Sequence, residues 1–390
     1  MSEAYIVAVA RSAGGKRDGR LAGIHPVDLA GKVIAALVER AGADPALIED
    51  VIMGCACTGG QQGANIGRFA ALVAGLPETT PGTTVDRQCG SSQQALQFAA
   101  ATVMAGVQDI VIAAGIESMT RVPMGLPWTL AAKHGFGSWR SPGFDALYGD
   151  QPITQFAGAE LLARKYGFSR EQLDAFALES HRRAAAATQE GKFDAEIVPI
   201  NVTTPDGETI VHRTDEGIRF DANLEKMASM KTLQEGGVIT AANASQLCDG
   251  AAALLVANER GLKALGATPV ARVHHMSVMG DDPIIMLEAP IPATRRALER
   301  AGMAIGDIDL YEVNEAFAPV PLAWAKALGA DPTRMNVNGG GIALGHPLGA
   351  SGAKLMATLV SALQDRGCRY GLQTMCEAGG MANVTIVERL

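Results

Sequence analysis

Two stretches of this chain repeat each other, and the repeat limits the folds that the chain can adopt. Residues 36–55 are ALVERAGADPALIEDVIMGC, and residues 296–316 are RALERAGMAIGDIDLYEVNEA. Each pattern predicts the end of a helix, an Ala-Gly stop, a short linker and then a strand. The sequence therefore predicts two related α/β halves.

The parallel between the halves extends further along the chain. A helical pattern begins at Cys89 and ends at Gly106, before the apolar strand pattern DIVIAAG. In the second half, His346 precedes the helical pattern ASGAKLMATLVSALQDRG and the strand pattern YGLQTMC. Strands that alternate with helices of this length predict a mostly parallel sheet covered by helices, with ligands at the loops that leave the strand ends.

The chain is long enough for more than one domain. It has 390 residues, of which 48% are hydrophobic, and this is ample for large buried cores. We expect an N-terminal half at residues 1–263 and a C-terminal half at residues 269–390. From about residue 119 to 248 the periodicity weakens, and prolines and tryptophans crowd the start of this segment. This segment is predicted to be a loop domain inserted into the first half.

Two elements stand out within the inserted segment. Residues 158–191 have one long helical pattern, and Asp206-Gly207 predicts the turn of a hairpin because glycine accepts a positive φ. The arginines and lysines here can be read as a solvated surface or as contacts for phosphates.

The charge balance limits the partners of the protein. Its formal net charge is −8, and no block of lysine and arginine occurs, so we expect neither nucleic-acid nor membrane binding. The two ends of the sequence predict no signal peptide, membrane span or organelle address. We expect a soluble cytoplasmic protein in which any anionic ligand meets a local basic patch.

Cys89 lies where a helix is predicted to begin. The free N–H groups and the dipole of a helix start favour a thiolate, as in reactive cysteines. The same position also suits a small buried hydrophobic residue, so the location alone leaves both interpretations open. The six cysteines include no C-x-x-C pair, and reduced thiols are the simpler expectation.

Two further residues are candidates to act with Cys89. His346 lies between Gly345 and Pro347 in the glycine-rich stretch NVNGGGIALGHPLGASGAK. The repeat gives His346 the place in the second half that Cys89 has in the first, so the two could face each other as base and nucleophile. Cys376 ends a predicted strand in QTMCEAGGMAN, where the following glycines let backbone N–H groups point outward. Each residue could instead be structural.

Other classes of site lack their motifs. The chain contains no G-x-S-x-G, no G-x-x-x-x-G-K-[ST] and no G-x-G-x-x-G fingerprint. Cys55, Cys57, His274 and His275 match no zinc spacing, and we interpret them as structural. No metal site is expected.

Four motifs, in this order and spacing, resemble the thiolase family across essentially the whole chain: VDRQCGSSQQA, NEAFAP, NVNGGGIALGHPLGASGAK and TMCEAGG. The resemblance implies an α/β thiolase fold, with two pseudo-symmetric βαβαβαββ halves in five layers (αβαβα) and an inserted loop domain. It also implies acyl transfer between coenzyme A thioesters, with acyl-CoA substrates, coenzyme A or acetyl-CoA as co-substrate and no tightly bound cofactor. A homodimer or homotetramer is implied as well.

The resemblance also assigns catalytic roles. Cys89 would be the acylated nucleophile, His346 its base, and Cys376 the acid/base for the substrate α-proton or the leaving thiolate. One oxyanion hole would combine His346 with a water held by Asn314, and the other the backbone N–H groups of Cys89 and Ala378. The family usually has glycine at the position of Ala378, so this hole requires a backbone conformation that alanine tolerates.

The resemblance extends to coenzyme A contacts and to the acyl pocket. Ser245 and Arg219 match positions that contact the pantetheine and the nucleotide of coenzyme A, and Met286 matches a pocket-wall methionine. Acetoacetyl-specific biosynthetic members usually have methionine where this chain has Gln155, and VDRQCGSSQQA looks more like catabolic 3-ketoacyl-CoA thiolases.

We therefore expect thiolytic cleavage of a 3-ketoacyl-CoA to acetyl-CoA and a shortened acyl-CoA, as in fatty acid β-oxidation. Three alternatives stay open. They are a biosynthetic condensation of two acetyl-CoA, a decarboxylating ketoacyl synthase, and a non-catalytic thiolase-like protein that binds acyl-CoA or lipid.

Overall fold

The first half of the molecule alternates strands and helices. The computed structural model describes residues 2–204 and 206–390. The strands of the first half are β1 (Tyr5–Ser12), β3 (Asp50–Gly54), β4 (Gly82–Val85), β5 (Ile110–Ser118) and β9 (Cys248–Ala257). Its helices are α1 (Pro26–Arg40), α2 (Ile66–Val73) and α3 (Ser91–Met104), and the short strand β2 (Gly15–Lys16) pairs with β9.

The second half repeats this order. Its strands are β10 (Ala271–Gly280), β11 (Leu310–Val313), β12 (Tyr370–Glu377) and β13 (Met381–Arg389). Its helices are α10 (Pro290–Ala301), α11 (Pro319–Leu328), α12 (Gly341–Leu344) and α13 (Ser351–Arg366), and α9 (Glu259–Leu265) connects the halves. The counterpart of β4 is reduced to one isolated bridge between Tyr311 and Met335. The repeated sequences form the end of α1 with β3 and the end of α10 with β11, as predicted.

The strands join into one sheet whose order is β11-β12-β13-β10-β1-β9-β5-β3-β4. The halves meet where β1 and β10 pair antiparallel, with Tyr5 opposite Arg272. The prediction of a mostly parallel sheet is wrong, because β5–β9, β12–β13, β1–β9 and β10–β13 are antiparallel as well. The last strand of each half does not follow a crossover helix: β13 returns directly from β12, and β9 follows the inserted segment. An antiparallel return is therefore possible.

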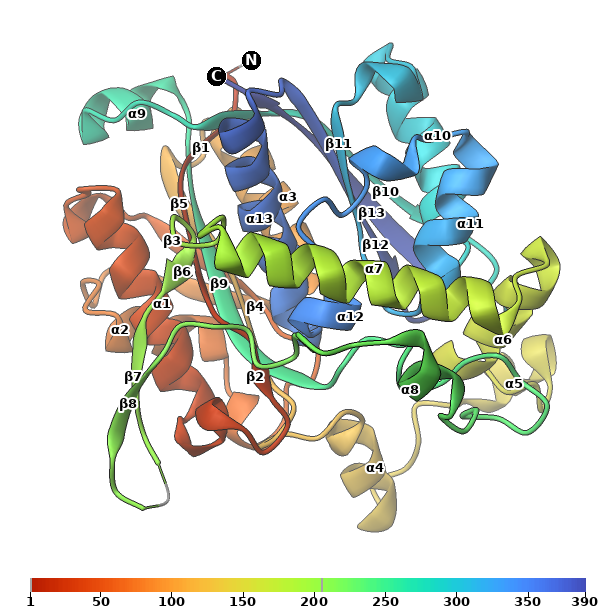
Figure 1. Cartoon of the computed structure of the whole chain (residues 1–390). Coiled ribbons are helices and arrows are strands. Elements are labelled where there is room, and N and C mark those ends of the chain that lie inside the picture. The colour runs from red at the N-terminus through yellow and green to blue at the C-terminus, as the bar shows by residue number, and fades with distance from the viewer. Residues whose placement is uncertain (1, 205) are drawn as a thin grey trace.

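Helices cover both faces of each half-sheet. Helices α3 and α13 contact each other at the centre of the molecule, and their apolar faces share one core with residues from both halves of the sheet. The helices α1 and α2 cover the first half from outside, and α10 and α11 cover the second (Figure 1). The molecule thus has five layers, and the starts of α3 and α13 lie between the two half-sheets.

Over its described residues, the inserted segment forms five helices and three short strands. They are α4 (Leu126–Lys133), α5 (Pro142–Tyr148), α6 (Gln155–Tyr166), α7 (Arg170–Gln189), β6 (Ile197–Val198), β7 (Ile200–Thr203), β8 (Thr209–His212) and α8 (Leu224–Ala228). Helix α7 lies across the front of the molecule (Figure 1). The predicted hairpin is confirmed, because β7 pairs antiparallel with β8 and Gly207 has φ +84°. Among the described helices, none has both the length and the apolar composition needed to cross a bilayer.

The prediction of a single long helix over residues 158–191 is wrong, because this stretch contains the end of α6 and the whole of α7. Gly167 ends α6 in the left-handed region, at φ 69°. Ser169 then caps α7, with Gln172 completing a capping box. The chain therefore turns between two helices.

A buried ionic network ties the inserted segment to the core. Arg11 of β1 pairs with Glu196 at 2.6 Å and with Asp215 at 3.0 Å, and both acids belong to the inserted segment. Lys354 of α13 lies 3.2 Å from Asp215, and its Nζ donates to the carbonyl of Leu344 at 2.5 Å. Because the charges are paired and hydrogen-bonded, they can be buried, and they hold the turn before His346.

Candidate active site

Cys89 lies in a tight turn between β4 and α3. Gln88 has φ +51°, an uncommon value for a residue with a side chain. Its backbone N–H donates to Asp86 Oδ1 at 2.7 Å, and its carbonyl accepts from Ser91 Oγ at 2.6 Å. These local hydrogen bonds stabilise the strained turn and place Cys89 at the start of α3, as predicted. The strain at Gln88 was not predicted, although Asp86 and Ser91 are typical turn residues.

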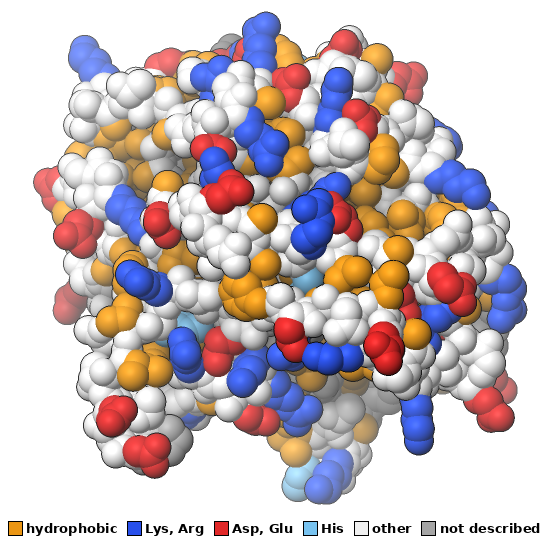
Figure 2. Space-filling view, viewed as in Figure 1, with side chains coloured by type: hydrophobic (Ala, Val, Ile, Leu, Met, Phe, Trp, Pro, Cys, Tyr) orange, Lys and Arg blue, Asp and Glu red, His pale blue; other side chains and the backbone are white. Residues whose placement is uncertain are grey.

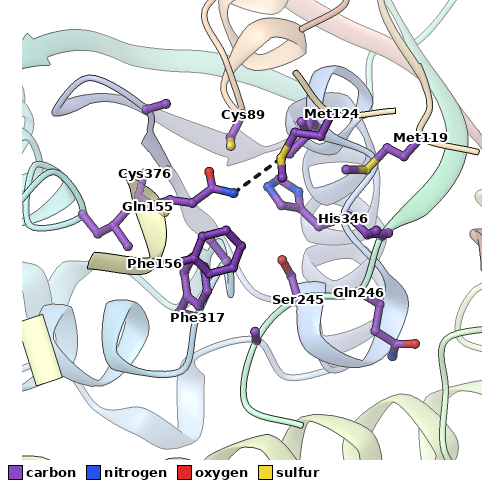
Figure 3. A pocket seen from close by; sticks show the side chains of 16 residues that line it. Cys89, Met119, Met124, Gln155, Phe156, Ser245, Gln246, Phe317, His346 and Cys376 are labelled. Atoms are coloured by element: carbon purple, nitrogen blue, oxygen red, sulfur yellow. Dashed lines mark hydrogen bonds between the residues drawn. The ribbon is translucent and has the colours of Figure 1, made fainter. Parts of the chain in front are cut away.

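One cavity brings Cys89, His346 and Cys376 together. Cys89 comes from the first half, and His346 and Cys376 come from the second, so the cavity lies where the halves meet. Figure 3 shows Cys89 and His346 directed toward a common space, with Phe156 and Phe317 below it. Apolar side chains form much of the remaining lining, namely Met119, Met124, Leu247, Leu287 and Leu348. The predicted meeting of Cys89 and His346 is present in this structure.

His346 is held in one tautomer. The Ser351 hydroxyl donates to the carbonyl of Pro347 at 2.9 Å, so its oxygen accepts from His346 Nδ1–H at 2.5 Å. The other ring nitrogen, Nε2, therefore keeps its lone pair, and Asn314 Nδ2 lies 3.4 Å from it. Burial, with the nearby Lys354 charge, lowers the pKa of His346 to about 3. The ring is neutral at physiological pH and can accept a proton through Nε2.

The two thiols are protonated in the resting site. Burial is the main cause that raises the pKa of Cys89 well above its ordinary value, and Cys376 and Glu377 add to it. Burial and the neighbouring Glu377 raise the pKa of Cys376 to about 12. The thiolate that the helix start was expected to favour is therefore absent at rest, because burial outweighs the helix dipole. Cys89 needs a base to become a nucleophile.

Asn314 and Ala378 complete the predicted set. Asn314 is buried beside His346. A hydrogen bond between Asn314 and Cys376 lowers the pKa of Cys376, against the larger effect of burial. The Oδ1 atom of Asn314 has no protein partner among the described residues. Ala378 lines the cavity and is not among the non-glycine residues with positive φ, whereas Gly379 and Gly380 have φ +85° and +75°. The backbone at Ala378 thus suits an L-residue, and the glycine-only conformation falls on the next two positions.

The three predicted ligand contacts differ in their placement. Ser245 lines the cavity. Arg219 is exposed and lies 3.4 Å from the side chain of Gln246, which also lines the cavity. Met286 is buried in the core and is not part of the lining, where its neighbour Leu287 stands instead. Figure 2 shows basic and acidic side chains interspersed on the face that it draws.

Gln155 and two aromatic residues with no predicted role, Phe156 and Phe317, also line the cavity. The side-chain amide of Gln155 donates to Met124 Sδ at 3.5 Å (Figure 3). The rings of Phe156 and Phe317 meet edge to face, with centroids 5.6 Å apart. The short apolar pattern around Phe156 gave no signal that distinguishes a pocket wall from a core helix.

No group of three or more metal-ligating side chains is present in the part of the chain that the structure describes. Cys55 and Cys57 instead surround the buried Glu117, whose carboxylate accepts from the backbone N–H groups of Ala56 and Cys57 at 2.9 and 3.2 Å. All six cysteines are free thiols.

Comparison with known families matches both halves of the chain. Residues 4–260 match the family described as thiolase, N-terminal domain, and residues 267–389 match thiolase, C-terminal domain. The chain belongs to the thiolase family. Thiolases are acyltransferases, so this thiolase is an enzyme of that class, and the family predicted from the four motifs is confirmed.

Individual relatives cover the whole thiolase chain. It is 52% identical to the steroid 3-ketoacyl-CoA thiolase FadA6 of Mycobacterium tuberculosis, over 100% of this chain and 95% of the relative. It is 41% identical to an acetyl-CoA acetyltransferase of Cupriavidus necator over the full length of both. The crystal structure of the Bacillus anthracis acetyl-CoA acetyltransferase superposes with a TM-score of 0.91 at 38% identity, covering 100% and 99% of the two chains. The expected thiolase fold is thereby confirmed.

Proposed function

We propose that this thiolase cleaves a 3-ketoacyl-CoA with coenzyme A, giving acetyl-CoA and a shortened acyl-CoA through an acyl group on Cys89. The observation that carries the proposal is the cavity shared by two thiols and a neutral histidine. Cys89 comes from the first half of the chain, and His346 and Cys376 come from the second. A nucleophile, a base and a second proton-handling group are the parts that this reaction requires.

The proposed reaction begins with His346. Its Nε2 takes the proton of Cys89, and the thiolate adds to the 3-keto carbon of the substrate. The bond between carbons 2 and 3 then breaks, Cys376 protonates the departing acetyl-CoA carbanion, and the acyl group stays on Cys89. The Cys376 thiolate next removes the proton of coenzyme A, whose sulfur attacks the acyl-cysteine, and His346 returns the proton to Cys89. Each proton and electron pair is thus accounted for within the site.

The oxyanions of this sequence need fixed donors. Protonated His346 offers Nε2–H, and Asn314, 3.4 Å from that nitrogen, is placed to hold a water beside it. The backbone N–H groups of Cys89 and Ala378 would form the second hole, which the negative φ of Ala378 permits. Sulfur suits the nucleophile because the acyl-cysteine is itself a thioester, so its exchange with coenzyme A costs little free energy.

Three observations support a 3-ketoacyl substrate. The lining is apolar around the rings of Phe156 and Phe317 and suits an acyl chain. Gln155, rather than methionine, stands at its wall. The relative at 52% identity is named a steroid 3-ketoacyl-CoA thiolase. We place Ser245 and Arg219 along the path of coenzyme A, and the enzyme in the degradative reactions of β-oxidation in the cytoplasm.

We further propose that the working enzyme is a homodimer or homotetramer. Large apolar side chains of the inserted segment are exposed, with Phe136 at 84% and Leu147 at 78%. Exposed apolar patches commonly mark interfaces. Light scattering on the purified chain tests this proposal, and a monomer at micromolar concentration would refute it.

The experiment on function measures thiolysis of 3-ketoacyl-CoAs of several chain lengths, with acetyl-CoA followed by mass spectrometry. Condensation of acetyl-CoA and consumption of malonyl-CoA are measured in parallel, with Cys89→Ala as the control. We expect thiolysis to exceed condensation for at least one substrate longer than acetoacetyl-CoA. Condensation that outruns thiolysis of every substrate would support the biosynthetic alternative, and decarboxylation of malonyl-CoA would indicate a ketoacyl synthase.

A further inference from the structure

Glu377 is a buried acid that the proposed reaction does not use. It is the last residue of β12 and directly follows Cys376, so its side chain points to the opposite face of the strand. The residue has 0% exposure, and neither carboxylate oxygen has a hydrogen-bond partner among the described residues. An ionised carboxylate without partners is costly to bury, whereas a neutral acid is much less so.

The carboxyl group lies beneath the turn that carries Cys89. The point where a Cβ on Gly90 would stand is 1.9 Å from Glu377 Oε1 and 2.8 Å from Asn383 Oδ1. Asn383 Nδ2 donates to the Gly90 carbonyl at 3.3 Å, which leaves its Oδ1 to face the carboxyl group. Two acceptor oxygens thus lie close to the same point below the residue after the nucleophile. Neither oxygen has a donor among the described residues, and a proton on Glu377 would supply one.

The charges around Glu377 give the carboxylate little compensation. Arg87, in the turn above, is the cation that favours ionisation, but its Nη1 contacts Met381 Sδ at 3.9 Å. Burial raises the pKa of Glu377 to about 8, against the smaller opposing effects of Arg87 and of the Asn383 backbone N–H, which approaches the carboxylate without a hydrogen bond of normal geometry. The other titratable groups on which Glu377 acts are the two thiols, Cys89 in the turn and Cys376 on its own strand, and its negative charge raises the pKa of both.

We propose that Glu377 is a positioning residue that works as a neutral acid and whose ionisation switches Cys89 off. The neutral acid donates to Asn383 Oδ1, and Asn383 in turn holds the Gly90 carbonyl. When Glu377 releases its proton to solvent, this hydrogen bond is lost and a negative charge opposes formation of the Cys89 thiolate. The enzyme then loses activity reversibly as the pH rises, although thiols in general become more reactive. This inference rests on the proposed role of Cys89.

The test compares wild type with Glu377→Gln, whose amide keeps the size of the acid and a donor toward Asn383. Alkylation of Cys89 by iodoacetamide is followed from pH 6 to 10 by peptide mass spectrometry, a readout that requires no coenzyme A. We expect Cys89 of E377Q to react faster than wild type above pH 8, on the order of tenfold for each unit by which the thiol pKa falls. Equal alkylation profiles in the two proteins would overturn the inference.

A matched control separates this effect from the loss of any buried acid. Glu312 of β11 is 1% exposed, burial raises its pKa well above its ordinary value, and it lies outside the lining of the cavity. Glu312→Gln should leave the alkylation profile of Cys89 as in wild type. A profile that shifts equally in both variants would contradict a specific role for Glu377.

Thermal unfolding gives a second measurement. The folded-state pKa of Glu377 lies above its ordinary value, so this group lowers stability as the pH rises from about 4.5 through about 8. The melting temperature of E377Q minus that of wild type should therefore be larger at pH 9 than at pH 5. If this difference is the same at both pH values, Glu377 is not a neutral acid in the folded protein. Should E377Q not fold, Glu377→Leu replaces it in both measurements. If the proposed function alone fails, acetyl-CoA does not acylate Cys89 in either protein, while the alkylation and melting differences persist.

Discussion

His346 Nδ1 lies 2.5 Å from the hydroxyl oxygen of Ser351, the first residue of α13. Because Ser351 donates its own hydrogen to the Pro347 carbonyl, the contact fixes which ring nitrogen carries the proton. The base is thus oriented by the start of the helix that packs against the helix of the nucleophile. Ser351 is a positioning residue, and its effect on the reaction passes through the imidazole.

Ser351→Ala should slow acylation of Cys89 by roughly ten- to hundredfold, because a lost hydrogen bond to a buried polar group is worth about 1–3 kcal/mol. Single-turnover acylation with acetyl-CoA measures this rate. Ser351→Thr keeps the hydroxyl and should recover part of it. Acylation of S351A at the wild-type rate would contradict the role of Ser351.

The acid side of the pH profile tests the neutral state of His346. Its pKa of about 3 in the folded protein means that the ring stays unprotonated down to that pH. The rate of acylation should therefore show no inflection near pH 6.5, the value of an ordinary histidine. We expect the rate of Cys89 acylation, measured by quenching the reaction at set times, to stay constant between pH 5.5 and 7. A tenfold fall per pH unit below 6.5 that is absent in His346→Gln would contradict the assignment.

Cys376→Ser should separate the two half-reactions. Activation of Cys89 by His346 does not involve Cys376, whereas transfer of the α-proton does. We expect C376S still to be acylated by acetyl-CoA, although more slowly because Cys376 also protonates the departing coenzyme A. Its steady-state thiolysis should fall by the larger factor of roughly 10²- to 10⁴-fold, because transfer of the α-proton is lost as well. If acylation itself collapses in C376S, the roles of the groups are misassigned.

Ala378→Gly tests the second oxyanion hole. Since the φ of Ala378 is not in the positive region, its N–H can already take the place that a glycine would give it. Turnover of A378G should stay near wild type, with a small loss of stability from the freer unfolded backbone. A gain in turnover of about a hundredfold would show that the hole is impaired by alanine in this protein.

Much of the fold was predictable because its signals are local. The copies at residues 36–55 and 296–316 each contain the end of a helix and the next strand, and both form as expected. The hairpin at Asp206-Gly207 also depends on two neighbouring residues. The break between α6 and α7 had such a signal too, in Gly167 followed by the capping box of Ser169 and Gln172, but the strong helical pattern on both sides concealed it.

Other features depend on contacts between distant segments. The pairing of β1 with β10 and the antiparallel return of β9 carry no local pattern. Cys89 and His346 could be paired from their equivalent places in the repeat. Ser351 and Glu377 could not be assigned a role in this way, because the first acts through a ring five residues away and the second through a turn nearly 290 residues away.

The central claim is that Cys89 carries the acyl group, and the mass of the intact chain tests it most directly. The thiolase is incubated with acetyl-CoA, quenched in acid and weighed by mass spectrometry beside Cys89→Ala and Cys368→Ala, the latter removing a thiol that does not line the cavity. We expect one acetyl group per chain in wild type and C368A, mapped to the peptide of Cys89, and none in C89A. An equal acetyl adduct on C89A, or no adduct on wild type, would contradict the account.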